Sequence, residues 1–410
     1  MEKKTVTSHH ILQNARYLLC WTIFALLAGI VGGILGGLFA KAIKAVTGLR
    51  AANSWLIFLL PVIGILISAL YRGALDADNR GTNMILSAIS EEGPISLPTG
   101  PLIFASTVLS HLGGASVGRE GAALQLGGWL GSGFSKLLHL NKSNRHIAVM
   151  CGMSAVFAAL FGTPVAAAIF CIEVARVGVF HYAALIPCIF SAFTGAVIAS
   201  RMGVDPEIYT IESIPWLDAL TLLKVAGLGL LCAFLAILLV IVFHGFENKA
   251  KKLLPNAYIR AAVCGMIITG LMLLPGMGIY SGAGTELITK ALAGEADSYA
   301  FLLKLLFTAL AIAGGFKGGE IVPTLSIGAC FGACFGALAG LPISLSGALG
   351  MIAVFAGATN CPIAALMIAM EMFEGKDLPF FAITVAISFV LSGYYSLYGK
   401  QRFAFAKTRY

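Results

Sequence analysis

Charged residues are scarce in this chain, which excludes an ordinary soluble domain. Only 11% of its 410 residues are charged, whereas 59% are hydrophobic and the mean hydropathy is +0.91. Soluble globular domains carry about 25% charged residues. A membrane-spanning helix needs about 20 predominantly apolar residues, and such runs fill most of the sequence. The sequence therefore predicts an all-α polytopic membrane protein without a separate soluble domain.

The sequence also lacks the signatures of an enzyme or a metalloprotein. Its nine cysteines are scattered through apolar runs, without the spacing of a metal site or a disulfide framework. It contains no nucleotide-binding loop and no nucleophile–base arrangement, and no cleavable signal peptide precedes the first apolar run. These absences favour a transport protein without metal or cofactor over a membrane enzyme or a receptor-like scaffold.

The net charge of +8 does not indicate a nucleic-acid partner, because the cations gather near the chain ends. Lys3, Lys4 and Arg16 stand near the N-terminus, and GKQRFAFAKTRY ends the chain. Lys and Arg favour the cytoplasmic side of a membrane, so both termini are predicted to be cytoplasmic, in a cell (inner) membrane. The acidic segment 202–218 has no Lys or Arg and is predicted to be non-cytoplasmic.

Three motifs recur in the same order in the two halves of the sequence. VFAALFGTPVAAAIFCIE (156–173) matches VFAGATNCPIAALMIAME (354–371), GREG (118–121) corresponds to KGGE (317–320), and GTNMI (81–85) resembles GTELI (284–288). With cytoplasmic termini and an external linker, each half crosses the membrane an odd number of times. The halves are then inverted-topology repeats, as in many transporters. The predicted parts are a tail at 1–16, a first repeat at 17–201, the linker at 202–218, and a second repeat with a short basic C-terminus at 219–410.

Three glycine-rich segments interrupt the apolar sequence: NRGTNMI (79–85), GREGAALQLGG (118–128) and GGFKGGEIVP (314–323). Non-helical backbone persists at membrane depth only where protein buries it or where it lines a cavity. An apolar run follows each segment, so each is predicted to be a helix N-terminus inside the membrane. The free N–H groups and the positive dipole end of such a helix favour an anion. We expect these broken helices to converge on a central anion site; glycines that serve only packing are the alternative.

Glu120 is the candidate for a proton-carrying gate. Ionisable side chains inside a membrane are costly and mark functional sites, and poor solvation beside an anion favours the protonated carboxyl. When deprotonated, the carboxylate can occupy the anion's place, and this mutual exclusion couples anion movement to proton movement. A structural pair with Arg119 is the alternative. Because adjacent residues on a helix do not face each other, Arg119 is expected to pair elsewhere and to support the turn.

Other polar residues have two open interpretations each. Glu320 occupies the equivalent break and either tunes the anion site or is a buried glutamate satisfied by backbone N–H groups. Glu173 and Glu371 end the matched segments, which predicts a structural role such as capping or pairing with basic residues. Hydroxyls near the C-terminus can donate to an anion or anchor the membrane interface; they belong to Tyr394, Tyr395 and Tyr398.

GREG with LQLGG, followed by GGEIVP within an inverted repeat, resembles the CLC family of anion channels and anion/proton antiporters over residues 20–405. The resemblance implies a homodimer in the lipid bilayer, with one pathway per subunit and helix N-termini facing a central anion. Glu120 matches the gating glutamate. The anion-binding set implied in this way is Thr82, Asn83, Gly118, Arg119, Gly121, Gly319, Glu320, Ile321 and Tyr398, with Phe403 and Phe405 as rivals of Tyr398.

Three departures from the chloride-transporting members resemble the bacterial fluoride/proton antiporter branch. GTNMI stands where chloride members carry Gly-Ser-Gly-Ile-Pro, Glu320 replaces an apolar residue, and Val174 follows Glu173 where a second glutamate is common. Fluoride is strongly hydrated and needs close, strong donors. The resemblance thus implies a fluoride/proton antiporter that exports fluoride from the bacterial cytoplasm. A chloride/proton antiporter or voltage-gated-type chloride channel is the alternative, followed by an inverted-repeat transporter of cations or neutral solutes.

Overall fold

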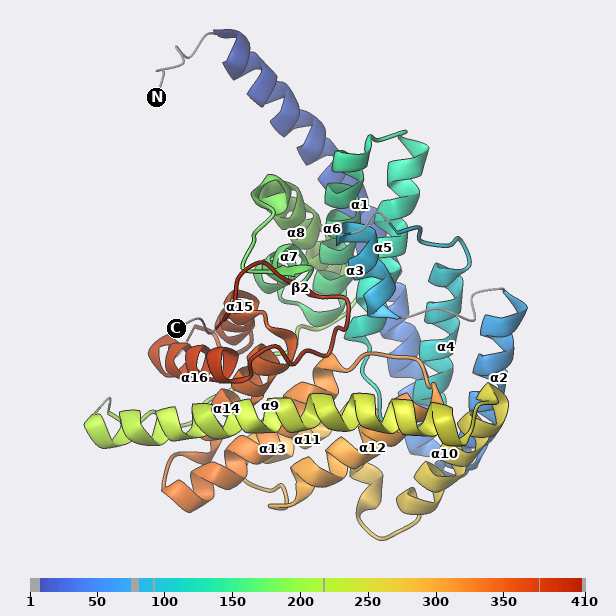
Figure 1. Cartoon of the computed structure of the whole chain (residues 1–410), viewed down its shortest axis with the longest axis vertical. Helices are drawn as coiled ribbons and strands as arrows, with labels where there is room; N and C mark the ends of the chain where they lie inside the picture. Colours follow the sequence, from blue (N-terminus) through green and yellow to red (C-terminus); the bar gives the residue numbers. More distant parts are fainter. Residues whose placement is uncertain (1–7, 75–80, 91–92, 217, 376, 408–410) are drawn as a thin grey trace.

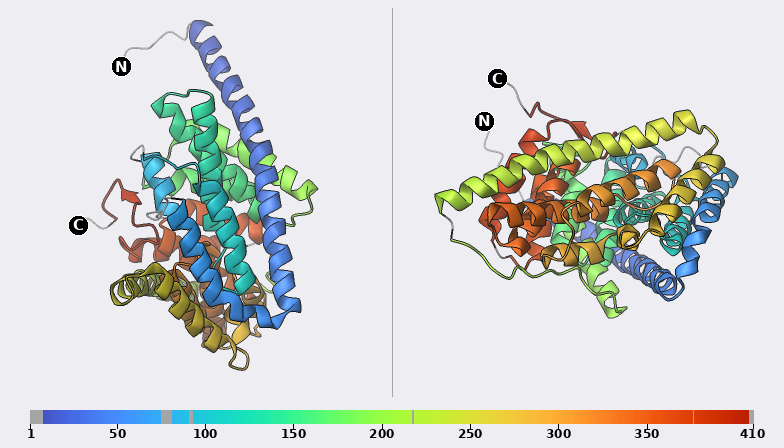
Figure 2. Two further views of the ribbon diagram at one scale, coloured as in Figure 1. Left: turned by 90° about the vertical axis from the view of Figure 1, so that its right-hand side faces the viewer. Right: turned by 90° about the horizontal axis from the view of Figure 1, so that it is seen from below.

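The computed structural model describes residues 8–74, 81–90, 93–216, 218–375 and 377–407. Within these ranges the chain forms sixteen α-helices, three 3-10 helices and two short strands, and the helices cross at varied angles (Figures 1 and 2). The prediction of an all-α polytopic membrane protein is confirmed. Six described helices are long and apolar enough to cross a membrane: Gln13–Ala52, Ser54–Gly73, Lys142–Phe161, Tyr182–Arg201, Ala219–Leu253 and Ile321–Ala339.

The first half of the chain contains α1 to α8. The helix α1 begins at Ser8, inside the segment predicted as a tail, and its first turns project beyond the other helices (Figure 1). Residues 1–7 of that tail lie outside the described residues. The elements are α1 (Ser8–Ala52), η1 (Ser54–Leu59), α2 (Leu60–Gly73), α3 (Thr82–Ser90), α4 (Thr99–Gly113), α5 (Glu120–Leu137), α6 (Lys142–Phe161), α7 (Pro164–Glu173), β1 (Arg176–Val177), η2 (Tyr182–Ala184) and α8 (Leu185–Arg201).

The second half contains α9 to α16 and ends on a strand that pairs with the first half. Arg176 in β1 lies opposite Arg402 in the parallel strand β2. Residues 79–80 and 408–410, which belong to predicted motifs, are also outside the described residues. The elements are α9 (Ala219–Leu253), α10 (Ala257–Met272), η3 (Met277–Tyr280), α11 (Thr285–Leu292), α12 (Ala300–Gly314), α13 (Ile321–Ala339), α14 (Ile343–Thr359), α15 (Pro362–Met372), α16 (Leu378–Leu391) and β2 (Arg402–Phe403).

The motifs that match in sequence occupy equivalent places in the two halves. The helices α3 and α11 each begin directly after a glycine with positive φ, Gly81 at +61° and Gly284 at +101°, a conformation that favours glycine. The helices α7 and α15 each begin at a proline, Pro164 and Pro362, which suits the first helical position. α5 packs on α6 as α13 packs on α14. The inverted orientation of the halves stays a prediction.

The glutamates that end α7 and α15 cap each other's helix. The Glu371 carboxylate accepts hydrogen bonds from the N–H groups of residues 165 and 166, at 3.0 and 2.8 Å, where α7 begins. The Glu173 carboxylate accepts from the N–H groups of residues 363 and 364, at 3.2 and 2.8 Å, where α15 begins. The first N–H groups of a helix have no partner within it, and negative charge is favourable there. Capping is therefore the structural role of both glutamates.

Glycines bring the long helices beside the central breaks into backbone contact. A Cβ atom added at Gly131 in α5 would lie 2.1 Å from the carbonyl oxygen of Ala148 in α6. One added at Gly332 in α13 would lie 2.1 Å from the carbonyl oxygen of Ser346 in α14. Small residues allow such close approach in membrane helices. These contacts hold α5 and α13 in place, and the first residues of both helices, Glu120 and Ile321, are buried.

Candidate functional site

The glycine-rich breaks before α5 and α13 are joined by a backbone bridge. The N–H of Gly118 donates to the carbonyl oxygen of Gly319 at 2.6 Å, and the N–H of Gly319 donates to the carbonyl oxygen of Gly118 at 2.7 Å. Buried N–H groups need partners, and here each break supplies the other's. These two amides are consequently engaged. Gly118 and Gly319 hold the breaks together, and their own N–H groups are not free donors for an anion.

Glu120 is the first residue of α5, and its side chain is fully buried. Its Oε2 accepts a hydrogen bond from the N–H of Arg119 at 3.0 Å. The same oxygen is so close to Gly118 that a Cβ atom added there would lie 2.7 Å from it. The carboxylate is thus folded back over the start of α5, in the place where the sequence predicts an anion.

Arg119 contacts two carboxylates. Its Nη2 donates to Oε1 of Glu207 at 2.5 Å, whereas its Nε lies 3.4 Å from Oε1 of Glu120. The expected partner elsewhere is therefore Glu207, although the pair with Glu120 also exists. That second contact is possible because Arg119 precedes the helix as its N-cap, so the helical spacing rule does not apply to it. Only the acidic character of the linker could have drawn attention to Glu207.

The linker anchors Glu207 beside the site. The N–H of Glu207 donates to the carbonyl oxygen of Phe161 at 3.3 Å, and the N–H of Tyr209 donates to that of Met372 at 2.8 Å. The Tyr209 hydroxyl also donates to Oε2 of Glu207 at 3.1 Å. This segment therefore does more than connect the halves, because it presents a carboxylate to Arg119.

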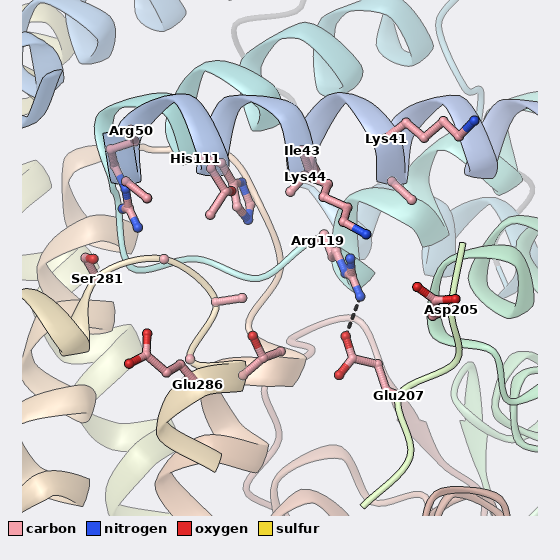
Figure 3. A pocket seen from close by; sticks show the side chains of 18 of the residues that line it. Lys41, Ile43, Lys44, Arg50, His111, Arg119, Asp205, Glu207, Ser281 and Glu286 are labelled. Carbon is pink, nitrogen blue, oxygen red and sulfur yellow. Dashed lines mark hydrogen bonds and ion pairs between the residues drawn. The ribbon is translucent and has the colours of Figure 1, made fainter. Parts of the chain in front are cut away.

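An outer cavity of about 620 Å³ lies on the linker side of the bridge. Figure 3 shows Lys44 and Arg119 pointing into it near the middle of the view, and Arg50 and His111 to their left. The charged residues of its lining are Lys41, Lys44, Arg50, Arg119, Asp205, Glu207 and Glu286. Because Glu207 is paired with Arg119, the remaining cations outnumber the remaining carboxylates. A cavity of this charge concentrates anions.

An inner cavity of about 650 Å³ gathers five of the predicted anion-binding residues. They come from the start of α3, from the break before α13 and from the C-terminal segment; they are Thr82, Asn83, Gly319, Glu320 and Tyr398. Gly319 lines this cavity, while Arg119 lines the outer one. The bridge and the Glu120 carboxylate thus lie between the two cavities.

The inner cavity contains hydrogen-bond donors of different kinds. Tyr398 is 3% exposed, and its hydroxyl has no hydrogen-bond partner among the described residues. Oδ1 of Asn83 accepts from the N–H of Lys400 at 3.0 Å, which orients the amide and leaves its NH₂ group for another partner. The Thr82 hydroxyl is 3.5 Å from the carbonyl oxygen of Gly121 and donates to it weakly. Tyr398 and Asn83 therefore keep donor groups that face no described hydrogen-bond partner.

The remaining residues of the predicted anion-binding set lie at the starts of α5 and α13. Gly121 is the second residue of α5 and Ile321 is the first of α13, so their N–H groups belong to first turns without helical partners. Glu320, the N-cap of α13, is half-buried, and its carboxylate makes no hydrogen bond within the described parts of the chain. A glutamate satisfied by backbone N–H groups, the alternative for Glu320, is thus not what the structure contains.

Tyr398, and not its rivals Phe403 and Phe405, lines the inner cavity. Phe403 packs against Tyr394 with ring centroids 5.1 Å apart, and Phe405 is 72% exposed. Gln401 fixes the segment of Tyr398. Its Nε2 donates to the carbonyl oxygens of residues 174 and 359, at 3.0 and 2.8 Å, and its Oε1 accepts from the hydroxyl of residue 396 at 2.8 Å. Sequence reasoning did not identify Gln401, since its partners are remote in the chain.

Lys304 is a second residue that sequence reasoning missed. It is fully buried in α12, and its Nζ donates to Oγ of Ser116 at 3.0 Å and to the carbonyl oxygens of Tyr280 and Gly282, at 3.1 and 2.7 Å. Lys304 thereby ties a wall of the outer cavity to the segment that leads into Gly118. A single cation within the apolar run FLLKLLF was the available signal, because intramembrane charges mark functional regions.

Comparison with known proteins is in agreement with this arrangement. Residues 63–393 match the family model described as voltage gated chloride channel. A chloride/fluoride channel protein of Pseudomonas syringae pv. tomato is 32% identical over 398 residues, which cover 95% of this chain and 88% of that protein. The H(+)/Cl(-) exchange transporter ClcA of Cronobacter sakazakii is 26% identical over 400 residues, 87% of this chain and 82% of that protein.

Two solved structures share the fold. The crystal structure of a CLC-type fluoride/proton antiporter superposes with a TM-score of 0.91 at 32% identity, covering 94% of this chain and 98% of that one. A slow cyanobacterial Cl-/H+ antiporter superposes with a TM-score of 0.77 at 19% identity, covering 91% and 94%. This chain therefore belongs to the voltage-gated chloride channel family, the CLC family of membrane transport proteins.

Proposed function

We propose that this protein exports fluoride from the bacterial cytoplasm in exchange for protons, with Glu120 as the proton-carrying gate. The observation that carries the proposal is the place of the Glu120 carboxylate, which lies over the start of α5 between the outer and inner cavities. An anion that binds this helix end has to displace the carboxylate. Protonation removes the charge of the carboxyl group and frees it to move, so that the two ions alternate at one place.

Fluoride is favoured as the anion by the donors of the inner cavity. The Tyr398 hydroxyl and the Asn83 amide line the same cavity as Glu320, whose carboxyl becomes a further donor when it is protonated. Bonds from such donors to an anion are short and strong, as a strongly hydrated ion requires. The solved relative at 32% identity is a fluoride/proton antiporter. Chloride/proton exchange is the second candidate, since relatives at 26% identity are H(+)/Cl(-) exchange transporters.

The proposal includes cytoplasmic termini and a homodimer in the inner membrane. The cations of the chain ends and the acidic linker support this orientation through the positive-inside tendency. One face of α8 is apolar and exposed, with Ile186, Phe190, Phe193 and Val197 each 44–50% exposed. Apolar faces of this kind contact lipid or a second copy of the chain.

Ion efflux from liposomes tests the proposal. Purified protein is reconstituted with internal fluoride or chloride, and anion release and proton uptake are followed with ion-selective and pH electrodes. We expect fluoride to leave faster than chloride while protons enter. In Glu120→Gln the proton movement should disappear, whereas Glu212→Gln, an exposed linker carboxylate, should behave as the wild type. Chloride release as fast as fluoride release would refute the choice of ion, and unchanged proton uptake in Glu120→Gln would refute the gate.

A further inference from the structure

A third pocket, of about 410 Å³, lies where α2, α10 and the end of α12 meet. The helices α2 and α10 pack side by side at the right of Figure 1. The described lining of this pocket contains three cations and no carboxylate; the cations are Arg72, Arg260 and Lys317. Cations around a hollow attract an anionic group, and the proposed ion pathway uses neither arginine.

Both arginines are held in place by neighbouring groups. The guanidinium carbon of Arg72 lies 5.9 Å from the centre of the Tyr258 ring. Nη1 of Arg260 donates to the carbonyl oxygen of Leu254 at 3.1 Å, and its buried Nε has no hydrogen-bond partner among the described residues. A buried donor without a partner is unfavourable. An oxygen of a phosphate group satisfies such a donor, because Arg presents a fork of N–H groups that matches phosphate geometry.

The surface beside the pocket is apolar. Ile259 and Met266 on α10 are 52% and 56% exposed, and Leu253 at the end of α9 is 79% exposed. In a membrane protein these side chains contact lipid tails. A cationic pocket next to such a surface matches the two parts of a phospholipid, and this distinguishes a lipid from a free phosphate ion.

The pocket lies on the side of the molecule that is predicted to be cytoplasmic. It shares Gly315 and Lys317 with the inner cavity, whereas the linker lines the outer cavity beyond the Gly118–Gly319 bridge. Anionic lipids give the cytoplasmic leaflet a negative surface, and basic pockets between membrane helices on that side bind their head groups.

We propose that this pocket binds the phosphate group of an anionic phospholipid, with Arg72 and Arg260 as the binding cations. Because residues 315 and 317 belong to both hollows, the lipid contacts the segment that leads to Gly318 and Glu320. Bound lipid would therefore restrain one wall of the ion pathway. The binding step does not depend on which ion the protein carries, so its test stands apart from that of the proposed function.

Binding of short-chain phosphatidylglycerol to the purified full-length protein in detergent tests this inference by titration calorimetry. Each of Arg72→Gln and Arg260→Gln should weaken binding about five-fold, and the double variant about 25-fold, since one cation near a charged lipid surface contributes about 1 kcal/mol. Lys252→Gln, an exposed cation outside the pocket in the last turn of α9, should bind as the wild type. Arg72→Lys with Arg260→Lys keeps the charge but loses the fork of N–H groups, so it should bind more weakly than the wild type and more tightly than the double glutamine variant.

Two further arms identify the ligand. Phosphatidylcholine of the same chain length should bind at least five-fold more weakly, and glycerol 3-phosphate should not displace phosphatidylglycerol at equal concentration, because it lacks the tails. Equal displacement by glycerol 3-phosphate would overturn the lipid as the ligand. Wild-type affinity in the folded double variant would overturn the pocket, and size-exclusion chromatography of each variant verifies that it is folded.

Discussion

Gly319→Ala tests the backbone bridge that joins the two breaks. A Cβ atom at this position would lie 2.4 Å from the backbone nitrogen of Gly121 and 3.0 Å from its Cα. Both are backbone atoms at the start of α5, so no side chain can rotate out of the way. The backbone of Gly319 is not in the left-handed region, and the substitution therefore acts through this clash alone.

The expected cost follows from two effects. Overpacking in a well-packed interior costs about 1–3 kcal/mol. Separating the segments also weakens two hydrogen bonds, between Gly118 and Gly319 in both directions, each of which contributes about 0.5–1.5 kcal/mol. The sum is about 2–6 kcal/mol. We expect a lower melting temperature in detergent and, because the bridge positions the starts of α5 and α13, slower fluoride efflux from liposomes.

Gly133→Ala is the matched control, since Gly133 lies in α5 and an added Cβ there meets no atom within 4 Å. Replacing this helical glycine should stabilise the protein by about 0.5–1 kcal/mol and leave efflux unchanged. If Gly319→Ala unfolds at the wild-type temperature and transports fluoride at the wild-type rate, the bridge does not hold the site together and the reasoning is wrong.

Three other predictions concern side chains around the site. Glu371→Gln and Glu173→Gln each exchange a charged helix cap for a neutral one, and thermal unfolding should show a loss of about 1–2 kcal/mol for either, adding in the double variant. Arg119→Gln removes a cation from the outer cavity and should raise the fluoride concentration for half-maximal flux; adding Glu207→Gln should restore part of the loss, and simple addition of the two effects would refute their coupling. Tyr398→Phe removes one donor and should weaken fluoride binding in calorimetry by tenfold or more, with no change in melting temperature, because the hydroxyl has no described protein partner.

The glycine-rich breaks could be located from the sequence because their signals are local. Glycine and polar residues that precede an apolar run mark a helix start, and α3, α5 and α13 begin within or at the end of the three predicted segments. Glu120 was identifiable for a similar reason, as a charge in an apolar region. Positive φ at Gly81 and Gly284 explains why a glycine suits this position in both GT motifs.

Contacts between distant parts of the chain could not be predicted from local sequence patterns. Arg119 and Glu207 are 88 positions apart, and Lys304 and Ser116 are 188 apart, so neither pair leaves a periodic pattern. The family resemblance placed Gly118 and Gly319 in the anion-binding set, and the sequence did not show that the two breaks meet. Once the two ends meet, their amides bond to each other, and the donors that remain come from Tyr398, Asn83 and the first turns of the helices.

The reciprocal caps also constrain the order in which the two halves can fold during translation. The amides that begin α7 emerge from the ribosome 205 positions before Glu371, the residue that satisfies them. Lipid offers unpaired backbone groups no substitute partner. The start of α7 in the first half therefore lacks its cap until nearly the whole chain has been translated. A chain that stops short of α15 cannot present a finished N-terminal half, and translation of the last helices completes both halves at once.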